Sequence, residues 1–521
     1  MRPHYYTIVA VCFSLLGLLC SPSLSACSSQ KYCVKGLIDL HGEILKLPEN
    51  TTIVFEKGGK IVNGSIFGNN TKIKGAFDDC LGVTLTGTWY VKVISDTWFD
   101  QACLSDNEII KNLNILQSDK IRQTLYIDRD HCLELSSKFN TGLSVASNTK
   151  VFLNAVLSIE GNNLERYNIV SIAGKENVIW EGGEVRGDVG KHNYIAGSTS
   201  EWGFGVYIYG ARNISITGFQ ASLCTGDGFY ISGDSGTSLD DYSNASKNIV
   251  LRYCVVHDDR RDGFSLVHAS DVLIEDCRAI NMGLTEYTPP CFGINIEPNK
   301  NKAVKNVRIV RFKTSNSYPD YCFSSGGYQL QGNISNRENI VLEDCSFDKG
   351  VGIASGGITI NRSTMKQLVL YTSNVPTGEP GNIIFNQCTI SGGNGIQFDG
   401  RKRIDINAHT PYYLFTNCDI STTTINKSIP GFIWGTDLDN VYAKLVFDNC
   451  QIRIQPELPN NNIIAAGFIH LDCSFKSCEI DSKSYVLKPR GIRFEGCDIN
   501  CKSTDNKGSN SLINCRVKTS Q

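Results

Sequence analysis

From about residue 170 onward, short runs of alternating apolar and polar residues return at intervals of roughly 23 to 35 residues. Alternation with a period of two places one face of a strand inward and the other toward solvent. In each repeat, a run that begins with glycine precedes a second run such as NIVLRYC or DVLIEDC. Because helical periodicity is almost absent, the pattern predicts a solenoid of stacked parallel strands. The runs that begin with glycine start at Gly205, Gly228, Gly263, Gly293 and Gly327.

Cysteine ends many of the second runs at one fixed place in the repeat, and the chain has 21 Cys. A thiol that recurs in this way behaves as a small buried hydrophobe stacked coil on coil. A regular ladder of disulfides is the alternative in an exported protein. The repeated cysteines are Cys254, Cys277, Cys345, Cys388, Cys418, Cys450, Cys478, Cys497 and Cys515. One predicted internal column contains Phe219, Cys254, Cys277, Phe312 and Cys345. Pairing stays open for the cysteines outside this ladder, which are Cys33, Cys80, Cys103 and Cys132.

The first 26 residues read as a signal peptide of the lipoprotein type. An apolar run from Thr7 to Cys20 is too short to span a membrane as a stable helix. The sequence Leu-Ser-Ala-Cys that ends at Cys27 resembles a bacterial lipobox, which implies cleavage before Cys27 and lipidation of its thiol. Ordinary cleavage at the same small residue is the alternative. We therefore expect an exported protein, periplasmic or at the cell surface, anchored to the outer or cytoplasmic membrane.

Three segments follow the predicted signal peptide. Residues 27–100 form a β-rich segment, and residues 101–145 carry apolar positions at helical spacing, which predicts a capping helix or linker. Residues 146–521 form the solenoid. The fold class is therefore all-β, a right-handed parallel β-helix with an N-terminal β-rich cap.

The charge of the chain narrows the class of partner only slightly. Fifty Lys and Arg residues face 52 Asp and Glu residues, a formal net charge of −2. No basic run stands out, so nucleic acid is not an expected partner. A near-neutral surface suits a polysaccharide, which is bound by hydrogen bonds and stacking, although many soluble proteins share this property.

Two aspartates stand just before a repeated glycine, Asp227 in TGDGF and Asp262 in RRDGF. In the predicted register they lie one rung apart, on the order of 5 Å. Two carboxyl groups that close do not both ionise easily, so one pKa should rise and suit an acid beside a base. Asp before Gly is also a common choice in turns, where its side chain bonds local amides. The candidate catalytic residues are Asp227, Asp258, Asp259, Arg260, Arg261 and Asp262.

A second group of polar and aromatic side chains is a candidate for binding sugar rings, which aromatic faces can stack on. Counting about 3.3 Å per residue along the strand, Glu297 falls more than about 15 Å from Asp227, so we expect no shared bond-breaking step. A structural role is an equally good explanation for several members. The group is Glu201, Trp202, Tyr207, Tyr230, His268, Asn295, Glu297 and Asn299.

The phrases EWGFGVYIYGARNISITGF, TGDGF, RRDGF and GINIEPN resemble those of bacterial right-handed β-helix proteins of the pectate lyase and polygalacturonase-like superfamily. Related sequences run E-W-G-H-G, W-G-D-G-I, R-R-Q-G and G-I-D-I-E-P-N. This chain departs from them at Phe204, Asp262 and Asn295, which puts substrate and activity in doubt. By this match, roles carry over to Glu201, Asp227, Arg260, Arg261, Glu297 and Asn299.

Members of that superfamily are mostly polysaccharide lyases, glycoside hydrolases and epimerases. The resemblance therefore implies a glycoside hydrolase or polysaccharide lyase acting on a complex or acidic polysaccharide. In a hydrolase, Asp227 is the expected general acid, and Asp258, Asp259 or Asp262 the residue that activates water. In a lyase, Arg260 or Arg261 is the base. No cofactor is certain and no metal ligands are assigned, although Ca²⁺ is possible in a lyase.

The alternative is a surface-anchored β-helix that binds glycans or has a structural role without catalysis. It predicts that the charged residues splay apart, each making only local turn bonds. A monomer or a homotrimer is expected in either case.

Overall fold

The computed structural model describes residues 24–28, 30–237, 241–283, 288–299, 302–316, 321–325, 336–353, 357–371, 382–393, 395–399, 412–422, 432–436, 442–454, 470–482, 492–501 and 511–519. The chain forms two compact units. The first comprises Met1–Tyr207 and Arg212–Ser222, and the second comprises Ile208–Ala211 and Leu223–Gln521. No helix in the described part is long and apolar enough to cross a membrane. Most of the predicted signal peptide and the side chain of Cys27 lie outside the described residues.

The first unit opens with a sheet built around one long strand, β6 (Lys60–Lys74). Strand β6 pairs with β3 (Leu37–Asp39), β4 (Ile44–Lys46), β5 (Thr52–Phe55) and β7 (Leu81–Trp89). Strand β1 (Leu24–Ser28) runs antiparallel to β2 (Lys31–Val34), which continues this sheet to β5. Gly68 has to be glycine, because a Cβ there would lie 2.5 Å from the buried Trp89 ring.

Helix α2 (Asp106–Leu116) covers one end of this sheet and touches the first coils. Ser105 and Glu108 form a capping box that satisfies free backbone N–H groups at its start. The buried Asn112 side chain accepts from Leu85 N–H and donates to the Val83 carbonyl, which fixes the helix on β7. The apolar positions with helical spacing are the buried ones, namely Ile109, Ile110, Leu113 and Leu116.

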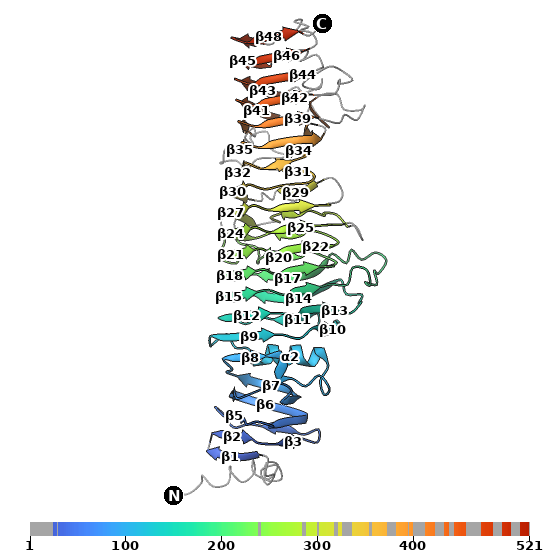
Figure 1. Cartoon of the computed structure of the whole chain (residues 1–521), viewed down its shortest axis with the longest axis vertical. Coiled ribbons are helices and arrows are strands. Elements are labelled where there is room, and N and C mark those ends of the chain that lie inside the picture. The colour runs from blue at the N-terminus through green and yellow to red at the C-terminus, as the bar shows by residue number, and fades with distance from the viewer. Residues whose placement is uncertain are drawn as a thin grey trace. The chain divides into compact units, whose positions relative to one another are not determined.

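Parallel coils follow in the first unit, each built from short strands joined by tight corners (Figure 1). Asparagines stack at one corner, where the Nδ2 groups of Asn177 and Asn213 each donate over 3.0 Å to the asparagine below. Asn suits this place because it tolerates the left-handed backbone that the corner requires. One sheet contains β8 (Val93–Ser95), β9 (Gln123–Ile127), β12 (Thr149–Leu153), β15 (Glu176–Glu181) and β18 (Arg212–Thr217). A second sheet contains β10 (His131–Leu133), β13 (Val156–Ile159), β16 (Glu184–Arg186) and β19 (Gln220–Ser222). A third sheet contains β11 (Thr141–Ser144), β14 (Arg166–Ala173) and β17 (Trp202–Tyr209).

The second unit repeats this plan with parallel pairing throughout its described strands (Figure 1). One sheet contains β21 (Ser246–Arg252), β24 (Ala269–Glu275), β27 (Ala303–Val310), β30 (Asn336–Glu343), β32 (Ile358–Asn361), β35 (Asn382–Asn386), β38 (Tyr412–Thr416), β41 (Tyr442–Asp448), β43 (His470–Lys476), β45 (Arg493–Glu495) and β47 (Ser511–Ile513). A second contains β20 (Phe229–Ser232), β23 (Phe264–Leu266), β26 (Ile294–Ile296), β29 (Tyr321–Ser325), β31 (Gly350–Ile353), β34 (Gln367–Tyr371), β37 (Ile396–Asp399) and β40 (Ile433–Thr436). A third sheet contains β22 (Val255–His257), β25 (Arg278–Ile280) and β28 (Lys313–Ser315). A fourth contains β33 (Thr364–Met365), β36 (Thr389–Gly393), β39 (Asp419–Thr422), β42 (Gln451–Ile454), β44 (Glu479–Ser482), β46 (Asp498–Cys501) and β48 (Arg516–Thr519).

The predicted cysteine ladder is confirmed as a column of buried thiols. Its members are free, and all are buried except the half-buried Cys515. Their Sγ atoms donate to backbone carbonyls of the coil, as Cys388 does to Ile360 over 3.2 Å. In the second unit, Phe312 occupies one rung of the same internal column. Cys33 is disulfide-bonded, whereas Cys80, Cys103 and Cys132 are free.

This burial predicts which thiols react in the folded protein. Cys103 and Cys132 are exposed, so a maleimide should label them within minutes at pH 8.5, while the fully buried thiols of the ladder stay unlabelled until the chain is unfolded. Mass spectrometry of tryptic peptides measures this directly. Rapid labelling of Cys388, Cys418 or Cys450 in the native protein would contradict the packing of the column.

Candidate functional site

The strands that begin with glycine lie in register in the second unit. Phe229 pairs with Phe264, which pairs with Ile294. Gly228 N–H donates to the Asp262 carbonyl over 3.0 Å, and the N–H group of the next glycine donates to the carbonyl of Phe292 over 2.8 Å. Asp227 and Asp262 therefore occupy successive rungs, as the sequence predicts. The fifth glycine of the series, Gly327, lies outside the described residues.

Close packing explains why glycine stands at the start of these strands. A Cβ on Gly228 would lie 2.4 Å from Val256 Cγ1 and 2.7 Å from Asp259 Oδ2. A Cβ on Gly263 would lie 2.7 Å from the carbonyl oxygen of Gly293. The same glycines hold the two preceding aspartates beside each other at the outer edge of the coil.

Asp227 is buried, with 4% of its surface exposed. Its Oδ1 accepts a hydrogen bond from Asp262 N–H over 3.3 Å, and Arg261 Nε lies 4.0 Å away. Burial raises the pKa of Asp227 to about 7, and the neighbouring Asp262 adds to the rise while Arg261 opposes it. Asp227 thus holds its proton up to neutral pH.

Asp262 is better supplied with donors than Asp227. Its Oδ1 accepts from Phe292 N–H over 2.7 Å, and its Oδ2 accepts from Asn295 Nδ2 over 2.9 Å and from Ser265 Oγ over 3.2 Å. Burial still raises the pKa of Asp262, but these bonds and Arg261 oppose the rise. Because donors stabilise a carboxylate, Asp262 is the member of the pair better suited to carry the charge.

Glu297 joins this cluster, contrary to the separation expected from counting along the strand. Asn295 Nδ2 donates both to Asp262 Oδ2 and to Glu297 Oε2, each over 2.9 Å. Burial raises the pKa of Glu297 to about 7, and Asp262 contributes to that rise. The count along the backbone is wrong as a guide to side-chain neighbours, because one amide group bridges the two carboxyl groups.

Asp258, Asp259 and Arg260 of the charged turn form hydrogen bonds with local groups. Asp258 adopts a left-handed backbone with φ 60°, and its carboxylate contacts His257 Nδ1 over 2.7 Å and Asn281 Nδ2 over 2.9 Å. Asp259 is fully buried, and its Oδ1 accepts from Cys224 N–H over 2.7 Å. The backbone N–H of Arg260 donates to the carbonyl of Cys224. Burial raises the pKa of Asp259 well above its ordinary value and the charge of Asp227 adds to the rise, so Asp259 lies near Asp227 together with Arg261 and Asp262.

The comparisons with known proteins agree with this architecture. A family model described as a right-handed beta helix region matches residues 130–309. These residues contain the coils around Asp227 and Asp262, and their strands are parallel. The chain is a right-handed parallel β-helix.

Two relatives of this β-helix come from Bacillus subtilis strain 168. The uncharacterized protein YclG is 27% identical over 287 residues, covering 49% of this chain and 48% of its own. The SPbeta prophage-derived uncharacterized protein YorA is 26% identical over 257 residues, covering 47% of this chain and 43% of its own. The chain therefore spans less than half the length of each of these curated relatives.

Solved structures similar to the β-helix include proteins whose names state an action on polysaccharides. The A-module of the Azotobacter vinelandii mannuronan C-5 epimerase AlgE4 is 11% identical with a TM-score of 0.44, covering 68% of this chain and 95% of its own. The tailspike protein gp49 of the Acinetobacter baumannii bacteriophage Fri1, a capsular polysaccharide depolymerase, is 14% identical with a TM-score of 0.37. That match covers 81% of this chain and 64% of the tailspike protein.

Of the candidate binding residues in the second unit, one lies on the outer face of the β-helix and two are bonded to local backbone groups. Tyr230 is half-buried on β20 and stands in register with Ser265 and Asn295, so it belongs to the outer face of the β-helix beside the cluster. His268 is buried, and its Nδ1 contacts the backbone of Ala303. Asn299 is half-buried and accepts from Lys302 N–H through its carbonyl.

The other candidates belong to the first unit of the β-helix. Glu201 and Trp202 are half-buried at the start of β17, and the Arg166 guanidinium lies over the Trp202 ring at 4.5 Å. Tyr207 stacks on Phe204 with ring centroids 5.7 Å apart. Phe204, which stands where the resemblance expects histidine, is thus an aromatic packing residue.

A Ca²⁺ ion, possible in a lyase, stays a prediction for this site. Among the described residues, no group of three or more His, Cys, Asp or Glu side chains is arranged to hold a metal ion.

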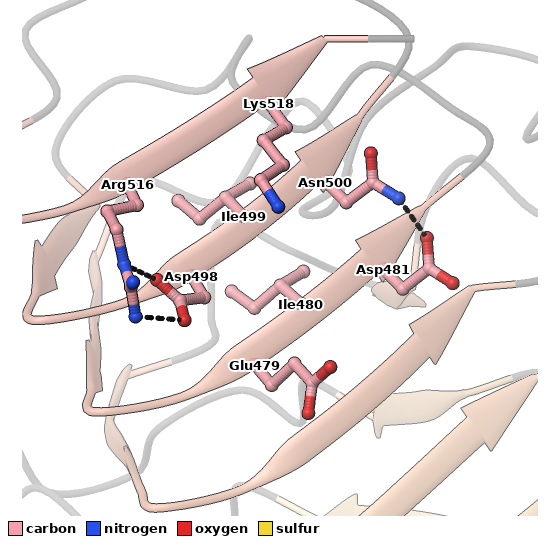
Figure 2. A pocket seen from close by; sticks show the side chains of 8 residues that line it. All are labelled: Glu479, Ile480, Asp481, Asp498, Ile499, Asn500, Arg516 and Lys518. Carbon is pink, nitrogen blue, oxygen red and sulfur yellow. Dashed lines mark hydrogen bonds and ion pairs between the residues drawn. The ribbon is translucent and has the colours of Figure 1, made fainter.

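A shallow opening of about 290 Å³ lies on another part of the β-helix, over β44, β46 and β48 (Figure 2). In Figure 2, Arg516 bonds both oxygens of Asp498 over 2.7 and 2.8 Å, and Asn500 donates to Asp481. The Arg516–Asp498 ion pair and the Asn500–Asp481 hydrogen bond are exposed to solvent, and such an ion pair contributes little stability. The opening lacks the buried, shared carboxyl groups of the cluster around Asp227.

Sequence reasoning missed two members of that cluster. Ser265 donates to Asp262, and its outward position was readable from the alternation in GFSLV. The backbone N–H of Phe292 also donates to Asp262, and a backbone donor leaves no trace in residue type. Only the register of the rungs reveals it.

Proposed function

We propose that the chain is an enzyme that hydrolyses glycosidic bonds of a complex or acidic polysaccharide. Asp227 is the general acid and Asp262 is its ionised partner. The observation that supports this proposal is the unequal pair of neighbouring carboxyl groups, in which Asp262 receives three donors while Asp227 keeps a pKa of about 7. Neighbouring carboxyl groups in unequal surroundings suit acid and base roles.

The spacing of the pair favours a mechanism with retained configuration. The backbones of adjacent rungs stand about 4.8 Å apart, and carboxyl groups held at that spacing would match the ~5–5.5 Å of retaining glycosidases. In the first step an oxygen of Asp262 bonds to the anomeric carbon, and Asp227 gives its proton to the leaving glycosidic oxygen. Water then attacks that carbon and loses a proton to Asp227, which releases Asp262. Three donors occupy three of the four lone-pair directions of Asp262, which leaves one for this bond.

A lyase reaction is the less favoured route. It needs Arg260 or Arg261 as the base, and arginine is a poor base because a guanidinium is protonated at all ordinary pH values. Screening a panel of polysaccharides for new reducing ends and for the absorbance of unsaturated uronates separates the two reactions. The proposal expects reducing ends without unsaturated products.

The pKa of Asp227 predicts the alkaline side of the pH profile. The general acid works only when protonated, so kcat/KM should be high below neutral pH and fall as the pH rises through about 7. Initial rates of reducing-end release between pH 5 and 9 measure this limb. A rate that stays constant from pH 6 to 9 would remove Asp227 from the role of acid.

Binding of a glycan without cleavage is the second candidate, and the deep burial of Asp227 and Asp262 favours it. It predicts that polysaccharide binds while no bond breaks.

We also propose that the protein is exported and anchored through lipid on Cys27. Metabolic labelling with a clickable fatty acid, compared between the wild type and Cys27→Ala, tests the anchor.

A further inference from the structure

One half-buried cation of the second unit has no carboxylate partner among the described residues. Lys302 is half-buried, and its Nζ donates to Ser232 Oγ over 3.1 Å. The Tyr209 ring lies below the ammonium, with its centroid 5.7 Å away. An ammonium has three N–H donors, and Lys302 forms no ion pair within the part of the chain that the structure describes. Burying a charge is costly unless it is paired.

The carboxylate whose charge acts on Lys302 already has a hydrogen-bond partner. Asp234 is exposed, and its Oδ1 accepts from Tyr209 OH over 2.7 Å. Its charge favours the ammonium of Lys302, but burial outweighs it and lowers the pKa of Lys302. Holding the charged form of Lys302 here therefore lowers the stability of the fold, and binding of an anion from outside the chain would offset that loss.

A second polar group without a hydrogen-bond partner stands close to Lys302. His268 Nδ1 lies 3.0 Å from the backbone nitrogen and 3.1 Å from the carbonyl oxygen of Ala303. Nε2 is buried and has no hydrogen-bond partner. Burial lowers the pKa of His268, and the charge of Lys302 lowers it further, which keeps the ring neutral. The ammonium of Lys302 and Nε2 of His268 are therefore two polar groups of this region that an added ligand could bond.

This region lies on the same face as the acidic cluster. Ser232 ends β20, and the residue two before that strand is Asp227. Five residues of extended chain separate them, which corresponds to about 16 Å. A polymer held over β20 reaches both places.

We propose that Lys302, with Ser232 and Tyr209, binds an anionic substituent of the polysaccharide, a carboxylate or a sulfate ester, away from the bond that is cleaved. This assignment rests on the proposed function, because it needs a polymer on this face. It makes Lys302 a residue that selects acidic chains over neutral ones. A charge-assisted hydrogen bond of this kind changes affinity by about 10-fold or more.

Affinity electrophoresis of the full chain tests the assignment with matched pairs of polymers. The pairs are polygalacturonate with its fully methyl-esterified form, and dextran sulfate with dextran, which separate carboxylate from sulfate ester. The wild type should bind one charged polymer, and Lys302→Met should weaken that binding about 10-fold or more. Lys313→Met removes an exposed cation from β28 and serves as the control, with an affinity within about 2-fold of the wild type. The Tm of Lys302→Met should equal or exceed that of the wild type.

Two results would overturn the assignment. One is equal binding of charged and neutral polymers by the wild type, and the other is an affinity of Lys302→Met equal to that of the wild type. Failure of the catalytic proposal looks different, because Asp227→Asn would then cleave polysaccharide normally while Lys302→Met still lost affinity for the charged polymer.

Discussion

Asp227→Asn should abolish polysaccharide cleavage while leaving the β-helix folded. The amide cannot donate a proton to the leaving oxygen, and loss of a general acid reduces rates by about 10²- to 10⁴-fold. Asn keeps the oxygen that accepts from Asp262 N–H, so the register of the two rungs is preserved. We expect kcat to fall by at least about 100-fold in a reducing-end assay.

The stability of this variant separates catalysis from structure. The folded pKa of Asp227 is about 7, above its ordinary value of 3.8, so the native state binds this proton more tightly than the unfolded state. The wild type consequently loses stability as the pH rises from about 4 through 7. Asn has no charge to bury, so the Tm of the variant at pH 8 should equal or exceed that of the wild type.

Asp498→Asn is the matched control for activity. It removes an exposed carboxylate on β46 whose partner is Arg516, so its rate should stay within about 2-fold of the wild type. Normal cleavage by Asp227→Asn, or an equal loss in both variants, would contradict the catalytic assignment.

Phe447→Ala should produce the largest loss of stability among single substitutions in the later coils. Phe447 is fully buried between Phe415 and Phe475, with ring centroids 4.7 Å away on each side and nearly parallel planes. Removing the ring leaves a cavity between two aromatic faces, and such a change costs about 3–5 kcal/mol. Guanidinium chloride unfolding, followed by tyrosine fluorescence or circular dichroism, measures the difference.

Phe447→Leu is the control for this prediction, because leucine fills most of the space and keeps the strand pattern. Its loss should be clearly smaller than that of the alanine variant. In a stack of coils each rung contacts its neighbours, so the loss should also appear as faster hydrogen exchange in β38 and β43. A loss below about 1 kcal/mol for Phe447→Ala would mean that the column is not close-packed.

The coil register was readable from the sequence because glycine marks the same place in each repeat. Alternation identified the inward positions, and the recurrent thiol identified a buried column that the structure confirms at Cys254 and Cys277. The pairing of Asp227 with Asp262 followed from that register. These features depend on backbone spacing, which a period-two pattern determines.

Side-chain direction at the corners was not readable in the same way. Asp258 has a left-handed backbone, and Asp259 after it is fully buried. A sequence of consecutive charged residues does not reveal that one of their side chains turns inward. The link from Glu297 to Asp262 depends on both rotamers and on the Asn295 amide between them. Sequence spacing measures the backbone and carries no information on such bridges.

The most direct test of the account is a crystal structure of Asp227→Asn with a bound oligosaccharide from the polysaccharide that the wild type cleaves. The account predicts a sugar chain over β20, β23 and β26, with a glycosidic oxygen within hydrogen-bond distance of the side chain of residue 227. An oligosaccharide bound elsewhere, for example in the opening over β44, β46 and β48, with none beside residue 227, would contradict it.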